Sequence, residues 1–137
     1  MAMEGRFFGV MICNVPFLAT DVCMAPMARF SDGYADMVVI HAELPFAQLV
    51  KALLALEEGS HVRMPGVDYV KVSAVRIDPT PPFAADEVYA MDGELVPLAP
   101  LEVKVLPSQL TTVVSPQLTS SGAPVPLPKD AASTKGL

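Results

Sequence analysis

Carboxylates in tight turns are the residues of this chain that could bind a cation or accept a proton. The clearest case is Asp92-Gly93-Glu94, which lies between apolar residues. Asp-Gly supplies the two positive-φ positions of a type I′ turn, so this stretch predicts a β-hairpin. Glu94 is unusual because an ionisable residue directly follows the turn and precedes the apolar Leu95. Taken alone, the local pattern favours a solvent-exposed turn carboxylate over a functional one.

A second turn, over residues 30–36, contains another candidate carboxylate, Asp32. As a turn residue, Asp32 would accept a hydrogen bond from its own backbone. As a metal ligand it would need backbone carbonyl oxygens as well, because Asp36 is the only other carboxylate close to it in the sequence. The turn interpretation is favoured. His61 has no His or Cys at ligand spacing, so we expect it to be a hydrogen-bonding loop residue.

Length, charge and composition exclude several classes of protein. The 137 residues are 52% hydrophobic and 18% charged, which indicates one globular domain. The net charge is −6 and there is no Lys/Arg cluster, which argues against nucleic acid as a partner and against electrostatic docking on anionic lipid. No apolar stretch is long enough to span a membrane. We expect a cytoplasmic protein with two reduced core thiols, Cys13 and Cys23, and leave peripheral membrane contact open.

The elements that must position the turn carboxylates are mainly strands. Strands are predicted over residues 6–14 (buried on both faces), 37–40, 67–77, 101–106 and 111–114, besides the hairpin. A helix is predicted from Pro45 to Glu58, with Gly59 as its stop. Its apolar face, wide enough to bury, comprises Phe46, Leu49, Val50, Leu53, Leu54 and Leu56. One helix among several strands predicts a mainly β chain, a β-sandwich with that helix packed on it.

The domain is expected to cover residues 1–115, and the Ser/Pro/Ala-rich residues 116–137 are expected to form a flexible tail. The first predicted strand starts almost at Met1, with no hairpin partner before it. We therefore expect the sandwich to be truncated at its N-terminus.

Several fragments, in order, resemble the carboxy-terminal half of sphingosine kinases, within the superfamily of diacylglycerol-kinase-like lipid kinases. The similar fragments are residues 24–29, 31–36, 53–61, 69–77, 89–94, 103–107 and 113–116. Together they cover roughly residues 6 to 116 of this chain. Ceramide kinases share the Asp-Gly-x-Ala-Asp turn, so they remain an alternative.

The resemblance implies a two-domain enzyme that uses ATP and Mg²⁺ to phosphorylate the primary hydroxyl of a lipid. The lipid would be a sphingoid base, or alternatively diacylglycerol or ceramide. The carboxy-terminal β-sandwich would hold the lipid, in a pocket lined partly by the Met-rich residues 16–29 and by the helix. Nothing in this chain resembles the nucleotide-binding domain, so we expect it to be inactive without that domain. The alternative from another class is a non-catalytic β-sandwich that binds lipid or a partner protein.

The resemblance also assigns roles to individual residues. The family's Asp-Gly-Glu falls on Asp92, Gly93 and Glu94. Glu94 would aid Mg²⁺ binding or the general base, Asp92 would orient it, and Gly93 would let phosphate or adenosine approach closely. Asp32 corresponds to a structural Mg²⁺ ligand of bacterial members, with the carbonyls of Arg29 and Tyr34 completing that site.

Overall fold

The structure, a computed structural model, describes residues 2–82, 87–111 and 113. In these ranges the chain forms seven strands, one α-helix and a short 3-10 helix, so the prediction of a mainly β chain with one packed helix is confirmed. The elements are β1 (Phe7–Cys13), β2 (Ala35–His41), α1 (Phe46–Leu54), η1 (Ser60–Arg63), β3 (Val67–Val72), β4 (Ala74–Ile77), β5 (Val88–Met91), β6 (Glu94–Pro97) and β7 (Leu101–Lys104).

The central layer is an antiparallel sheet in the order β1-β2-β3. Its middle strand, β2, pairs with a strand on each side and is buried from Ala35 to Ile40. The prediction that residues 6–14 are buried on both faces was wrong. β1 is an edge strand, so Phe8 and Val10 on it are exposed.

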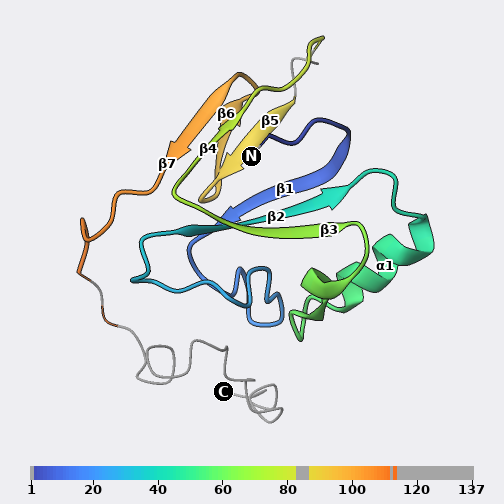
Figure 1. The fold of residues 1–137 in the computed structure, drawn as a ribbon, viewed down its shortest axis with the longest axis horizontal. Helices are drawn as coiled ribbons and strands as arrows, with labels where there is room; N and C mark the ends of the chain where they lie inside the picture. The colour runs from blue at the N-terminus through green and yellow to red at the C-terminus, as the bar shows by residue number, and fades with distance from the viewer. Residues whose placement is uncertain (1, 83–86, 112, 114–137) are drawn as a thin grey trace, which may run out of the picture.

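The core lies on one side of this sheet, between the strands and the helices. Figure 1 shows α1, η1 and the long loop after β1 on that side, and the two small sheets on the other. Residues three or four apart on the helix and two apart on the strands point into the same space. The buried cluster comprises Cys13, Met24, Ala25, Ala28, Val38, Ile40 and Val67, with Leu49, Leu56 and Met64 packed against it.

The helix is shorter than predicted and buries less of its apolar face. It ends at Leu54 rather than Glu58. The chain then turns through Gly59, whose φ is 68°, with hydrogen bonds from Gly59 N to Leu56 O and from Ser60 N to Ala55 O. This pair is the Schellman pattern, but it closes a run of turns after α1, so the predicted stop at Gly59 lies five residues beyond the last helical residue, Leu54.

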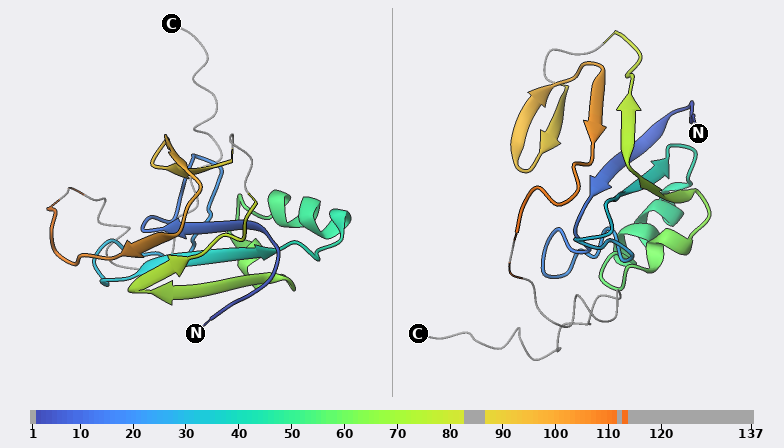
Figure 2. Two further views of the ribbon diagram at one scale, coloured as in Figure 1. Left: turned by 90° about the horizontal axis from the view of Figure 1, so that it is seen from above. Right: turned by 60° about the vertical axis from the view of Figure 1, so that its left-hand side comes forward.

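The single strand predicted over residues 67–77 is instead divided at Ser73. β3 stays in the central sheet, whereas β4 leaves it and pairs with β7, as Figure 2 shows. The alternating pattern continues through Ser73, so it carried no signal of the change of sheet. The strand predicted over 101–106 ends at Lys104. The predicted strand 111–114 lies partly, and the predicted tail 116–137 wholly, outside the described residues.

Candidate functional site

The predicted hairpin is present, and its turn holds the principal candidate residues. β5 and β6 pair antiparallel, with Met91 opposite Glu94. Asp92 and Gly93 have φ values of 49° and 89°, as a type I′ turn requires. The base of the hairpin is tied by hydrogen bonds from Tyr89 Oη to Ala99 O (3.0 Å) and from Leu98 N to Glu87 O (3.2 Å).

The hairpin turn presents its carboxylates to solvent. Asp92, Gly93 and Glu94 are all exposed. Among the described residues, no side chain or backbone group donates a hydrogen bond to the carboxylate of Asp92 or Glu94. A Cβ built on Gly93 would meet no atom within 4 Å, so the space beside the turn is open. These two carboxylates can therefore accept bonds from a ligand without losing a partner within the described chain.

Asp32 lies in a different kind of turn and has partners of its own. Tyr34 N donates to Asp32 Oδ1 over 3.0 Å, as the turn interpretation predicted. The ammonium of Lys71, on β3, lies 2.7 Å from Asp32 Oδ2. Burial alone would raise the pKa of Asp32, but hydrogen bonds from Lys71 and Tyr34 outweigh it and hold the pKa below 3.8. No hydrogen bond or ion pair in the described part of the chain links Asp32 to the hairpin turn.

Lys71 joins Asp32 to a fully buried carboxylate that sequence reasoning missed. Lys71 Nζ lies 3.0 Å from Oδ2 of Asp36, a residue with 0% exposure. Tyr69 Oη donates to Asp36 Oδ1 over 2.6 Å and accepts a bond from Met27 N over 3.2 Å. The sequence did contain a signal for this cluster, namely an aspartate inside the apolar strand Ala35–His41. A buried carboxylate needs hydrogen-bond or ionic partners.

The chemistry of this cluster fits an ammonium better than a metal ion. Although burial lowers the pKa of Lys71, its hydrogen bonds to Asp32 and Asp36 raise it above 10.5, so the side chain stays charged. Within the described ranges, no group of three or more His, Cys, Asp or Glu residues could hold a metal ion. Because the ammonium of Lys71 already lies 2.7 Å from Asp32 Oδ2 and neutralises it, the residues around Asp32 do not fit the structural Mg²⁺ ion that the resemblance implied.

His61 was expected in a loop, but it lies in a short 3-10 helix and is fully buried. It lies in η1 with 0% exposure, and its Nε2 is 3.1 Å from Met24 O. Burial lowers the pKa of His61 below 6.5, against the opposing effect of the hydrogen bond to Met24. The predicted hydrogen-bonding role is confirmed. His61 connects the Met-rich loop to the segment after the helix.

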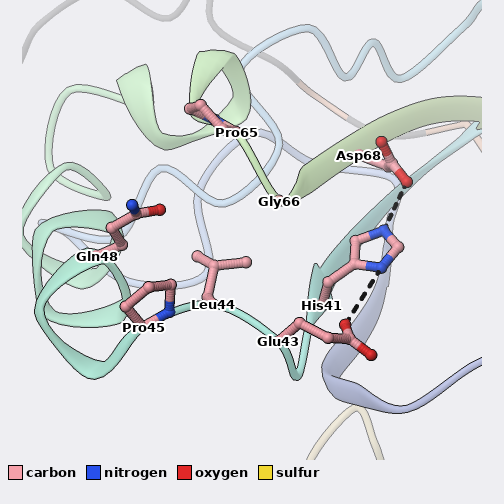
Figure 3. A pocket seen from close by; sticks show the side chains of 8 residues that line it. All are labelled: His41, Glu43, Leu44, Pro45, Gln48, Pro65, Gly66 and Asp68. Atoms are coloured by element: carbon pink, nitrogen blue, oxygen red, sulfur yellow. Dashed lines mark hydrogen bonds and ion pairs between the residues drawn. The ribbon is translucent and has the colours of Figure 1, made fainter.

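An open cavity of about 410 Å³ lies at the end of β2 and was not predicted. Figure 3 shows His41 between two carboxylates there: Nε2 is 2.8 Å from Asp68 Oδ2, and Nδ1 is 4.0 Å from Glu43 Oε2. The rest of its wall consists of Leu44, Pro45, Gln48, Pro65 and Gly66. None of the residues selected from the sequence as catalytic or metal-binding lines this cavity.

Comparisons with known proteins agree on one family. Residues 2–114 match the family described as YegS C-terminal NAD kinase beta sandwich-like domain. The chain is 35% identical over 101 residues to "Sphingoid long chain base kinase 5" of Saccharomyces cerevisiae, and 30% identical over 118 residues to "Sphingosine kinase 2" of Homo sapiens. It is 38% identical over 77 residues to "Sphingosine kinase 1" of Arabidopsis thaliana.

These matches cover much of this chain and little of the relatives. They cover 74%, 85% and 56% of this chain, respectively, but only 14%, 18% and 16% of the three relatives. The chain belongs to the YegS C-terminal NAD kinase beta sandwich-like domain family, and within it the chain is similar to sphingosine kinases.

Proposed function

We propose that this chain is the lipid-binding portion of a kinase that transfers the γ-phosphoryl group of ATP to the primary hydroxyl of a sphingoid base. The observation that carries the proposal is the similarity to named sphingoid base kinases over 74% and 85% of the chain. The functional domain is proposed to span residues 1–115.

The hairpin turn supports a role in phosphoryl transfer. Phosphoryl transfer depends mainly on positioning and on neutralising charge, and Mg²⁺ is commonly bound by one or two carboxylates plus water and phosphate. Asp92 and Glu94 are exposed carboxylates on a tied hairpin, and no atom blocks the approach to Gly93. Bound Mg²⁺·ATP would supply the transferable phosphoryl group. Glu94 would hold the cation or assist the base, and Asp92 would orient Glu94.

The apolar side chains on one side of the central sheet are the ones that we propose would contact a lipid chain. Met24 from the long loop, Leu49 and Leu56 from the helix region, and Met64 after η1 contact one cluster. Met side chains are unbranched and flexible, so they adapt to irregular apolar surfaces. The residues that would line a lipid pocket therefore meet at one side of the central sheet.

A chimeric kinase tests this proposal. The 101 matching residues of the Saccharomyces cerevisiae relative are replaced by those of this chain, and transfer of labelled phosphate from ATP to sphingosine is measured. We expect the chimera to be active. Glu94→Gln should lower kcat by roughly 10²–10⁴-fold, as for loss of acid–base or cation assistance. Asp92→Asn should lower kcat by roughly 10–100-fold, because Asp92 would only orient Glu94.

The control for this experiment is Glu102→Gln, an exposed carboxylate on β7, which pairs with β4 and not with the hairpin; this change should leave turnover unchanged. Undiminished activity of the Glu94→Gln chimera would remove Glu94 from the mechanism. A well-folded chimera that phosphorylates ceramide or diacylglycerol in preference to sphingosine would assign the domain to one of those kinases. A well-folded chimera that binds sphingosine but transfers no phosphate would favour a non-catalytic lipid-binding domain.

A further inference from the structure

One end of the central sheet and the turn before β2 together contain two carboxylates and an ammonium group that contacts both. Asp36 on β2 lies directly opposite Lys71 on β3 in the strand register, so the two side chains point to the same face. The lysine is long enough to pass Asp36 and reach Asp32 in the loop before β2. One cation thus joins two strands and a turn.

The hydrogen bonds of this cluster are complete on the carboxylate side. Asp32 Oδ1 accepts from Tyr34 N and Asp32 Oδ2 from Lys71, while Asp36 Oδ1 accepts from Tyr69 Oη and Asp36 Oδ2 from Lys71. Each carboxylate oxygen therefore has a donor. A divalent ion at Asp32 Oδ2 would compete with the ammonium of Lys71, which lies 2.7 Å from that oxygen and also neutralises a carboxylate with 0% exposure.

We propose that the Lys71 ammonium is the resident cation of the Asp32 turn, so that this domain folds without a divalent ion at that place. The lysine performs the work a structural metal would perform: it neutralises the carboxylates and fixes the turn against the sheet. Through Asp36 and Tyr69 the same cluster also holds Met27 N, and with it the Met-rich loop that packs on the core. The inference does not depend on the proposed function.

The test compares melting temperatures of the 137-residue chain in excess EDTA and in millimolar Mg²⁺ or Ca²⁺. The unaltered chain should melt at the same temperature in both. Lys71→Ala should melt roughly 5–10 °C lower in EDTA, because Asp36 is left buried without its cation. Divalent ions should restore much of that loss, since Asp32 and Asp36 then form an uncompensated carboxylate pair.

Two further variants serve as controls. Arg76→Ala removes an exposed ion pair with Asp78 and should change neither the melting temperature nor the response to ions. Asp32→Asn in the Lys71→Ala background should abolish the rescue by divalent ions.

The proposal is overturned if Mg²⁺ stabilises the unaltered chain and Asp32→Asn removes that gain, a comparison that holds even if Lys71→Ala fails to fold. It is also overturned if folded Lys71→Ala responds to divalent ions no more than the unaltered chain does.

Discussion

Asp32 and Asp92 both precede a glycine in a turn, yet their side chains have opposite environments. The carboxylate of Asp32 has 21% exposure and contacts Lys71, whereas Asp92 is exposed and, within the described ranges, has no hydrogen-bond donor. A carboxylate that already has a cation stabilises the fold, while one without a partner remains available to a ligand. The contrast assigns a structural role to Asp32 and leaves Asp92 and Glu94 as the candidates for chemistry.

His61 provides a residue-scale prediction of pH dependence. Because burial lowers the pKa of His61 in the folded chain below 6.5, the unfolded chain binds more protons on acidification. This contribution to stability is therefore fully present above 6.5 and is lost as the pH falls towards the folded pKa. The urea midpoint should fall between about pH 7.5 and about pH 5.5, and His61→Gln should show a smaller fall.

An NMR titration of the His41→Gln chain isolates the signals of His61, because the chain has only two histidines. The remaining imidazole signals should titrate with a midpoint below 6.5. A midpoint at or above that value would contradict the role of burial.

At the scale of elements, local patterns predicted the hairpin and a tight turn at Gly59, because both depend on neighbouring residues, but they placed the end of the helix four residues too late. Asp92 and Gly93 adopt positive φ, and Gly59 closes a Schellman turn. The division of residues 67–77 at Ser73 could not be predicted, since β4 leaves the central sheet to pair with β7, whose residues lie 24 to 30 positions later in the chain. The contacts of Lys71 could not be predicted either, because Asp32 and Asp36 are 39 and 35 residues away in the sequence.

Two glycine substitutions separate backbone strain from packing. At Gly59 an added Cβ would lie 2.9 Å from Pro26 Cβ and 3.1 Å from Cys23 Sγ, in addition to the strain of φ 68°. Gly59→Ala should lower the free energy of unfolding by roughly 2–4 kcal/mol. At Gly93 an added Cβ would meet no atom, so Gly93→Ala should lower the free energy of unfolding by only about 1–2 kcal/mol, from backbone strain alone.

Guanidinium denaturation of both variants measures the difference between them. Equal losses would show that the loop around Pro26 yields to the added methyl group. That loop would then not be tightly packed on the turn after the helix.

At the scale of the whole molecule, apolar surface and net charge together restrict how the chain can meet a partner. Phe46, Leu53 and Leu54 of α1 have exposures of 79%, 48% and 76%, so most of the apolar face predicted to be buried is uncovered in the described structure. Leu49, Ala52 and Leu56 on the other side of the helix region do face the core. The sequence showed that the helix is apolar but not that the described elements cover only one side of it.

No helix among the described residues is long and apolar enough to cross a membrane. The net charge of −6 leaves little electrostatic attraction to anionic lipid.

We expect the chain to bind neutral phosphatidylcholine vesicles through the exposed face of α1, and adding phosphatidylserine should not strengthen binding. Burying one Phe or Leu side chain is worth about 1.5–3 kcal/mol, so Phe46→Gln with Leu54→Gln should weaken vesicle binding by roughly tenfold or more. Lys51→Gln, an exposed change on the same helix, is the matched control and should bind as the unaltered chain does. Co-sedimentation measures the bound fraction.

Binding that depends on phosphatidylserine, or that survives the double substitution, would show that another surface meets the membrane. An unaltered chain that stays in the supernatant but doubles in mass by light scattering would show that a second copy covers this face instead.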